Sequence, residues 1–189
     1  MNTPAAPYEN PGDRLALTVD EEDHVAGRPN APVVLVEYGD FECPYCGQAY
    51  PVVEDLRRRY ADDLAFVFRN FPLVEIHPHA LAAAEAAEAA GLQRRFWSMY
   101  AVLFTHQDAL DPASLLLYAR TVGLDVDRFI EDVGSDAVER KIRRDAMSGV
   151  ASGVPGTPTF FVNGVRHTGG FGLGELSSAV EAAMHHAPT

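Results

Sequence analysis

A strand, a helix and a second strand follow one another within about 40 residues near the start of this chain. The apolar run Val-Val-Leu-Val at residues 33–36 lies between Pro32 and Gly39, which is typical of a buried strand. Residues 47–60 then space their apolar side chains as on one face of a helix, and Leu64–Phe68 is a second apolar strand-like segment. Because two strands joined through a helix run parallel, this order predicts a βαβ unit and an α/β fold.

Helical patterns dominate the middle of the chain, from Pro78 to about Ser152. Ala80–Ala90 is rich in alanine, the strongest helix former, and Gly91 is expected to end that helix. Three further helices are expected to begin after the capping residues Asp111, Asp125 and Ser135. About 75 helical residues are too many for a loop and must bury their own apolar faces. We therefore predict an inserted all-helical subdomain at about residues 77–152.

The C-terminal part returns to strands. Thr159–Val162 and Val165–Thr168 flank the dipeptide Asn163-Gly164, which favours a tight hairpin turn. A final helix is expected from Gly174 to about His185. The predicted order of elements is therefore βαβ, helical insert and ββα.

Composition excludes several classes of protein. The 189 residues, 47% of them hydrophobic, suit one folded domain and not a disordered chain. No apolar run approaches the ~18 residues that cross a bilayer, so we expect no membrane partner. The net charge is −12 and Lys and Arg form no concentrated face, which argues against nucleic acid. Only two cysteines, Cys43 and Cys46, are present, too few for a disulfide-rich scaffold.

Residues 1–30 include 13 Pro, Asn, Asp and Glu residues around one short apolar patch, and four of the acids form the run Asp20-Glu21-Glu22-Asp23. We expect a loosely ordered polar arm there, followed by one domain over residues 31–189. A secretory leader would place basic residues before ~7–15 apolar ones, a pattern that residues 1–30 lack. If Met1 is the natural start, we expect a cytoplasmic protein; removal of a leader would instead indicate a periplasmic or secreted one.

The cysteine pair Cys43-Pro44-Tyr45-Cys46 falls where the first strand gives way to the helix. A helix N-terminus favours the thiolate of Cys43, and Pro44 costs no hydrogen bond at the first helical position. Cys46 lies one turn deeper and is expected to be less exposed. We therefore predict that Cys43 is the attacking thiol and that Cys46 resolves the mixed disulfide.

Two other uses of the pair are less favoured. A structural zinc site needs four ligands, and the candidate histidines His77, His79, His185 and His186 have no finger-like spacing to the cysteines. We expect no metal. A purely structural disulfide would close too small a loop to remove much chain entropy. Beside a βαβ unit, redox chemistry is the favoured interpretation.

Two further positions are candidates for roles near the cysteines. Glu37 precedes Cys43 by six residues in the first strand. If that strand is buried, its carboxyl lies beneath the cysteines with a raised pKa and could exchange a proton with Cys46; the alternative is that it points to solvent. Pro158 precedes a strand and marks a tight entry to it, and most bonds before proline are trans.

Together these residues resemble the DsbA-like branch of the thioredoxin superfamily, whose members are thiol–disulfide oxidoreductases. The resemblance covers about residues 31–186 and rests on three stretches: Glu37 to Cys46; Arg69-Asn70-Phe71-Pro72-Leu73 with His77-Pro78-His79-Ala80; and Gly156 to Gly164. It implies a thioredoxin-like fold, βαβ–ββα with the helical insert. It also implies that Pro158 is cis and packs against the cysteine pair, with Thr157 presenting its backbone to an extended substrate.

The resemblance further implies an enzyme that exchanges a dithiol and a disulfide with protein or peptide substrates. Such an enzyme needs no cofactor but needs a redox partner, which the sequence does not identify. Pro44, Tyr45, Thr157 and Pro158 are expected to contact the substrate, within an apolar rim of Phe41, Tyr45, Val154 and Phe171. Because the dimerisation segment of disulfide isomerases is missing, we expect a monomer. The alternative is a redox-sensing or binding module without turnover.

Overall fold

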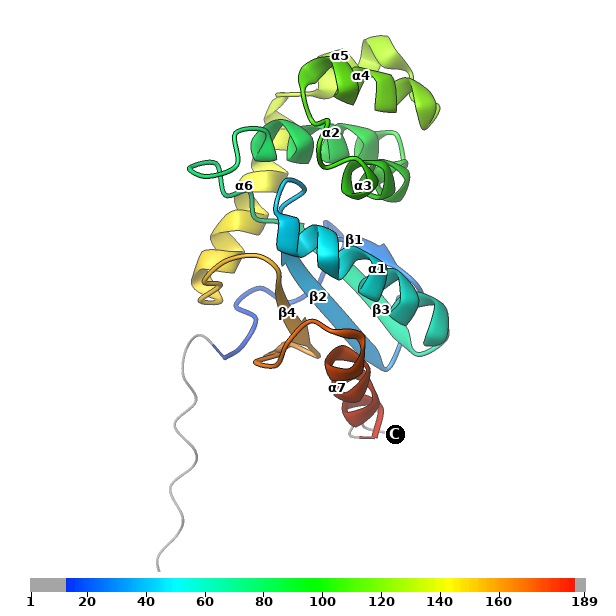
Figure 1. The fold of residues 1–189 in the computed structure, drawn as a ribbon, viewed down its shortest axis with the longest axis vertical. Helices are drawn as coiled ribbons and strands as arrows, with labels where there is room; N and C mark the ends of the chain where they lie inside the picture. Colours follow the sequence, from blue (N-terminus) through cyan, green and yellow to red (C-terminus); the bar gives the residue numbers. More distant parts are fainter. Residues whose placement is uncertain (1–12, 186–189) are drawn as a thin grey trace, which may run out of the picture.

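The computed structural model describes residues 13–185, whose arrangement is shown in Figure 1. These residues form a five-stranded sheet in the order β1-β3-β2-β4-β5. Its strands are β1 His24–Ala26, β2 Val33–Gly39, β3 Leu64–Asn70, β4 Thr159–Val162 and β5 Val165–Arg166. The helices are α1 Pro44–Arg59, α2 Ala80–Leu92, α3 Phe96–Thr105, α4 Pro112–Thr121, α5 Val126–Asp132, α6 Asp136–Ala151 and α7 Leu173–His185. The predicted order of βαβ unit, helical insert and ββα is confirmed.

Strand β2 lies at the centre of the sheet and is covered on both faces. It pairs in parallel with β3 and antiparallel with β4. Val33 and Leu35 pack into the larger apolar cluster on one face, and Val36 and Tyr38 into a smaller cluster on the other. Because successive side chains of a strand alternate between faces, Glu37 shares the face of Val33 and Leu35.

Helices α1 and α7 cover that face of the sheet (Figure 1). Cys43 is the N-cap of α1 and Pro44 its first residue, as the sequence predicts. The last turn contains Arg57, Arg58 and Arg59, whose charges favour the negative end of the helix dipole. The sheet and α1 therefore place the positive end of the helix above the carboxyl end of β2.

Helices α2–α6 form the insert at one end of the sheet, and α6 runs back from it along the sheet (Figure 1). The predicted caps are confirmed, since the side chains of Asp111, Asp125 and Ser135 each accept from backbone N–H groups of the following helix. The expected end of α2 at Gly91 is wrong: the helix continues to Leu92. Gly91 instead makes room for His24, whose Cε1 atom would lie 2.8 Å from a Cβ at this position.

An aromatic cluster joins the insert to the sheet. Phe41 before α1, Phe68 on β3, and Tyr100 and Phe104 on α3 have ring centroids between 4.9 and 6.0 Å apart. Such pairs each add about 0.5–1.5 kcal/mol beyond the burial of their area. The insert and the sheet therefore share one continuous core.

The N-terminal segment differs from the expected polar arm. His24–Ala26 forms β1 and pairs antiparallel with β3, so the sheet begins before residue 31. The acidic run ending at Asp23 was part of the expected loosely ordered arm, but the side chain of Asp23 is buried and accepts two hydrogen bonds, of 2.9 and 2.8 Å, from the buried guanidinium of Arg69. That charge pairing holds the segment to the sheet. Residues 1–12 of the expected arm lie outside the described residues.

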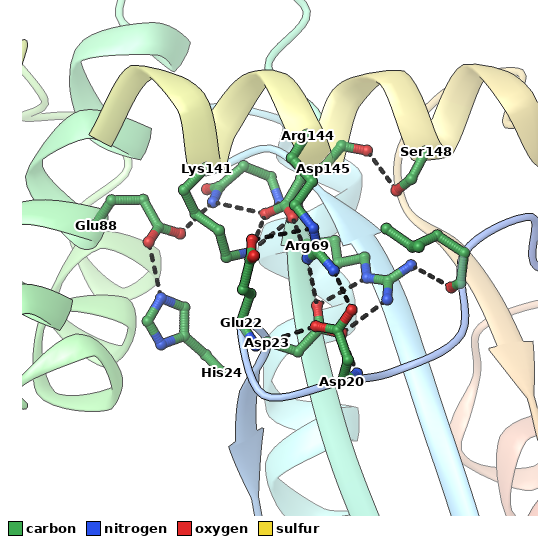
Figure 2. Close-up of polar contacts among 12 residues, drawn as sticks. Asp20, Glu22, Asp23, His24, Arg69, Glu88, Lys141, Arg144, Asp145 and Ser148 are labelled. Carbon is green, nitrogen blue, oxygen red and sulfur yellow. Dashed lines mark hydrogen bonds and ion pairs between the residues drawn. The ribbon is translucent and has the colours of Figure 1, made fainter. Parts of the chain in front are cut away.

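A buried charge cluster extends from this pair to the insert (Figure 2). Lys141 on α6 donates to both carboxylate oxygens of Asp145, at 2.6 and 2.7 Å. The side-chain amide of Asn70 donates to Asp145 and to Glu88 on α2, and Glu88 also pairs with His24 at 2.8 Å. Because each buried charge has a partner, the cluster can join β1, β3, α2 and α6 without an isolated ion.

Candidate functional site

The two cysteines lie at the N-terminal end of α1, both as free thiols. Cys43 is 3% exposed at the N-cap, and Cys46 is fully buried in the first turn. The backbone around Cys43 is held on both sides, because its N–H donates to the carbonyl oxygen of Asp40 and its own carbonyl accepts from Gly47 N–H. The predicted difference in exposure between the two thiols is confirmed.

The surroundings of Cys43 favour its thiolate. The hydrogen bond with the Cys46 thiol is the main cause that lowers the pKa of Cys43 to about 5, against the effect of burial, which raises it. The Thr157 side chain and the backbone N–H groups of Cys46 and Tyr45 lower it further. In the thiol form, Cys43 Sγ donates to the carbonyl oxygen of Thr157 at 3.4 Å. A low pKa at a helix N-terminus is typical of a reactive cysteine.

The surroundings of Cys46 and Glu37 instead favour their protonated forms. Burial raises the pKa of Cys46 well above its ordinary value, and the neighbouring Cys43 and Glu37 raise it further. Burial is also the main cause that raises the pKa of Glu37 to about 8, with a contribution from the charge of Cys43. Glu37 is 1% exposed, so the alternative that it points to solvent is excluded.

The neighbours of Glu37 across the sheet are apolar. In the register of the strands, Glu37 lies opposite Phe68 on β3 and Phe160 on β4. Neither of its carboxyl oxygens has a hydrogen-bond partner within residues 13–185. A buried carboxyl without hydrogen-bond partners keeps its proton to a higher pH than an exposed one. Glu37 therefore holds a proton close to the thiol of Cys46, which must lose its own proton to react.

The bond between Thr157 and Pro158 is cis. The resemblance predicts this cis bond, whereas the general preference of bonds before proline predicts a trans one. A cleft with a volume of about 300 Å³ lies beside it, and its lining includes Pro155, Pro158 and Phe171. Pro44 and Tyr45 are exposed next to the cysteines, Tyr45 by 61%. Four predicted substrate contacts, Pro44, Tyr45, Thr157 and Pro158, are thus on loops or helix ends around Cys43.

The expected apolar rim is only partly present. Phe41 is 1% exposed because its ring belongs to the aromatic core, and Val154 is 9% exposed within the second apolar cluster. Both are therefore core residues. Tyr45 and the partly buried Phe171 remain accessible.

The contacts that five polar residues make near the cysteines were not predicted from the sequence. Gln107, which follows α3, donates through Nε2 to the carbonyl oxygens of Phe41 and Cys43, at 2.8 and 2.9 Å. Asp40 and Glu42, before the cysteines, pair with His77 and His79 before α2. No residue spacing indicates the role of Gln107, whereas both histidines lie in a stretch on which the resemblance rests.

No three or more His, Cys, Asp or Glu side chains among residues 13–185 are grouped so as to hold a metal ion. His77 and His79, two of the candidate zinc ligands, are bound to carboxylates, and His186 lies outside the described residues. Across the same part of the chain, every helix is too short or too polar to cross a bilayer.

Comparison with known proteins gives one family. A family model described as thioredoxin matches residues 19–182. Among curated proteins, Na(+)/H(+) antiporter NhaA 1 of Salinispora arenicola is 49% identical over 171 residues, which are 90% of this chain and 26% of that protein. NhaA 1 of Mycolicibacterium gilvum is 46% identical over 180 residues, 94% of this chain and 29% of that protein. The chain thus spans little more than a quarter of the length of these relatives.

Solved structures show the same fold. A thioredoxin-like oxidoreductase from Silicibacter pomeroyi DSS-3 has a TM-score of 0.80 and 28% identity, covering 88% of this chain and 94% of that one. Wolbachia pipientis alpha-DsbA1 has a TM-score of 0.78 and 23% identity, over 92% and 96% of the two chains. BdbD from Bacillus subtilis, in its oxidised form, has a TM-score of 0.78 and 22% identity, over 87% and 94%. The predicted thioredoxin-like fold with a helical insert, as in DsbA, is confirmed.

Proposed function

The chain belongs to the thioredoxin family, and on this premise we propose that it is a DsbA-like thiol–disulfide oxidoreductase acting through the pair Cys43–Cys46. Its substrates are proteins or peptides that hold a disulfide or two thiols. The observation that supports this most strongly is the difference between the two sulfurs: a pKa of about 5 at Cys43 beside a raised pKa at buried Cys46. A thiolate next to a protonated thiol is the arrangement that disulfide exchange requires.

Reduction of a substrate takes two exchange steps. The Cys43 thiolate attacks one sulfur of the substrate disulfide, so that a bond from Cys43 Sγ to that sulfur forms and the other substrate sulfur leaves as a thiolate. Cys46 then loses its proton and attacks Cys43 Sγ, which forms the Cys43–Cys46 disulfide and releases the second substrate sulfur. Two electrons have passed to the substrate, whose thiolates take up protons. The reverse sequence oxidises a substrate dithiol.

Glu37 is assigned the proton exchange with Cys46. The carboxyl lies on the sheet face beneath α1, and its pKa of about 8 allows it to accept or return a proton near neutral pH. The exposed residues Pro44 and Tyr45, with the cis segment Thr157-Pro158, are assigned contact with the substrate.

The direction of exchange depends on the reduction potential. A potential near −120 mV would identify an oxidant and one near −270 mV a reductase, so a titration against a glutathione buffer decides between them. We retain a cytoplasmic location, a monomer and an as yet unidentified redox partner as parts of the proposal. The measured potential also bears on the location, because a strongly oxidising pair suits an oxidising compartment.

Trapping tests the mechanism. The variant Cys46→Ser is expected to accumulate disulfide-linked adducts with client proteins through Cys43, because the resolving sulfur is absent. The matched variant Cys43→Ser should form none. Wild-type protein should also turn over a model peptide disulfide with a supply of reductant. A protein that binds partners in a redox-dependent way but shows neither adducts nor turnover would be the sensing or binding module instead.

A further inference from the structure

We propose that His77 is a positioning residue for Cys46 and that it acts through Asp40. This inference deepens the proposed function, on which it rests, because it concerns the step in which Cys46 resolves the mixed disulfide. The two residues lie on different segments: Asp40 directly follows β2, and His77 lies between β3 and α2. They meet beside the sulfur that has no access to solvent.

Asp40 is the residue that links the end of β2 to the cysteines. Its backbone N–H donates to Cys46 Sγ at 3.5 Å, and its carbonyl oxygen accepts from Cys43 N–H at 3.1 Å. Its carboxylate closes the same turn, because Oδ1 accepts from the N–H of Glu42 at 2.8 Å. The orientation of the Asp40 backbone therefore decides whether its N–H points at Cys46 Sγ.

The carboxylate of Asp40 is itself held from the other side. Its Oδ2 atom accepts from the N–H of Leu73 at 2.9 Å and pairs with His77 Nδ1 at 2.7 Å. The Asp40 side chain is 0% exposed and that of His77 is 15% exposed, so water cannot readily replace the imidazole. A buried carboxylate that loses a donor turns toward another partner, and the turn that it stabilises shifts with it.

The N–H of Asp40 matters most when Cys46 is negatively charged. That hydrogen bond lowers the pKa of Cys46, against the burial and the neighbouring charges that raise it. As Cys46 loses its proton and attacks Cys43 Sγ, the N–H is a fixed donor to the developing charge. Cys43 attacks the substrate in the preceding step, before Cys46 acts, so a shift of Asp40 should slow resolution more than the first attack.

The neighbouring pair of Glu42 and His79 is a natural control. It has the same chemistry, since Glu42 accepts from His79 N–H and pairs with His79 Nδ1 at 2.9 Å. It also links the same two segments. It is more open, with the side chain of His79 44% exposed, and its hydrogen bonds are not to a cysteine sulfur. Substitution of His79 therefore shows how much the connection between the two segments contributes to the exchange rates when no hydrogen bond to Cys46 is affected.

The experiment follows the two exchange steps in one reaction. Reduced protein is mixed in a stopped-flow instrument with an aromatic disulfide whose released thiolate is coloured. The first release reports the attack by Cys43 and the second reports the attack by Cys46 on the mixed disulfide. The variants are His77→Phe, which removes the donor; His77→Asn, whose amide nitrogen replaces Nδ1; and His79→Phe.

We expect His77→Phe to slow the second phase about three- to tenfold, the range that corresponds to one hydrogen bond, and to slow the first phase less or not at all. His77→Asn should restore the second phase, and His79→Phe should leave both phases as in the wild type. Should His77→Phe not fold, the contrast between His77→Asn and His77→Ser tests the same point, because serine is polar but too short to reach Asp40.

Three results would overturn the inference: an unchanged second phase in His77→Phe, an equal slowing of both phases, or the same effect in His79→Phe. These are distinct from failure of the proposed function, in which wild-type protein itself would release no second thiolate. That result would remove the exchange reaction and the inference with it.

Discussion

Cys43 and Thr157 are 114 residues apart in the chain, yet Cys43 Sγ in its thiol form donates a hydrogen bond of 3.4 Å to the carbonyl oxygen of Thr157. The sheet brings them together, because β2 ends near the cysteines and pairs antiparallel with β4, which begins two residues after Thr157. The helical insert separates the two segments in sequence, and it also contributes to the site, because Gln107 donates to the carbonyl oxygen of Cys43. The pairing of β2 with β4, and not the chain between them, sets the distance from the cysteine to the cis segment.

The reactivity of Cys43 should follow its low pKa. We expect the rate of alkylation of the reduced protein by iodoacetamide to rise with pH to a plateau, with a midpoint near 5, and to modify only Cys43, because burial raises the pKa of Cys46. Mass spectrometry identifies the site, and initial rates at each pH give the midpoint. A midpoint near that of an ordinary thiol would contradict the thiolate at Cys43.

The Cys46 side chain should account for much of that shift. Its hydrogen bond is the main cause that lowers the pKa of Cys43. We therefore expect Cys46→Ala to move the alkylation midpoint up toward the ordinary value of a thiol, and Cys46→Ser, which retains a donor, to move it less. Equal midpoints in the two variants would show that a factor other than this hydrogen bond sets the pKa.

Glu37 should make stability depend on pH. Its pKa is raised from 4.5 to about 8 in the folded protein, so the unfolded chain releases this proton at lower pH than the folded one. The stability that depends on the protonated Glu37 carboxyl is present in full below pH 4.5, where the carboxyl is protonated in both states. This part of the unfolding free energy is lost as pH rises through about 8. We expect wild-type protein to lose up to about 4 kcal/mol of unfolding free energy over this range relative to Glu37→Gln.

Urea unfolding of both proteins from pH 5 to 8.5 measures this difference. The comparison is cleanest in a background with Cys43→Ala and Cys46→Ala, where the cysteines no longer titrate. There the charge of Cys43 is absent, so the pH dependence should be smaller but keep its sign, since burial is the main cause. Parallel pH profiles for the two proteins would mean that Glu37 is ionised in the fold.

The redox pair and four of the five strands could be predicted because their signals are local, whereas β1 was missed. Strand alternation, helix caps and the Asn163-Gly164 turn each depend on neighbouring residues, and the position of Cys43 as N-cap follows from them. The buried state of Glu37 follows from the same alternation once β2 is recognised as a central strand. The cis bond before Pro158 could be predicted only from the resemblance, since bonds before proline are mostly trans.

The residues that were missed depend on distant partners. Asp23 stands in an acidic run that is typical of an exposed segment, and only the fold shows that Arg69 on β3 is buried beside it. Gln107 acts on the carbonyl of Cys43, 64 residues away. A polar residue gives the same local pattern whether its partner is water or a buried group, so the sequence alone does not distinguish the two cases.

Removal of Arg69 should destabilise the protein strongly. Arg69 and Asp23 both have fully buried side chains, so Arg69→Met removes the two guanidinium hydrogen bonds of a buried carboxylate. The N–H of Asp20 at 3.0 Å and Arg144 Nη1 at 3.8 Å remain near that carboxylate but do not replace the lost pair. We expect a loss of about 3–5 kcal/mol in urea unfolding, reduced when Asp23→Asn is added. Arg58→Met is the control: Arg58 is 69% exposed in its pair with Asp55, and its loss should cost less than about 1 kcal/mol. Similar losses for Arg69→Met and Arg58→Met would contradict a buried pair.

The contact of α6 with the sheet should depend on Gly149. A Cβ added there would lie 2.6 Å from Cδ2 of Phe71 and 3.1 Å from Cδ1 of Tyr38, two rings packed edge to face. Alanine favours a helix by about 1 kcal/mol over glycine, but we expect the clash to outweigh this gain and Gly149→Ala to lose about 1–3 kcal/mol in urea unfolding.

Gly174→Ala in α7 is the matched control, because among the described residues no heavy atom from outside its own helix turn lies within 4 Å of the added Cβ. It should be neutral or slightly stabilising, since only the helix propensity changes. If both variants shift the unfolding free energy alike, α6 does not pack against Phe71 and Tyr38 as closely as these distances require. If Gly149→Ala alone is destabilising, a second substitution of Phe71 by leucine should recover part of the loss by opening space for the methyl group.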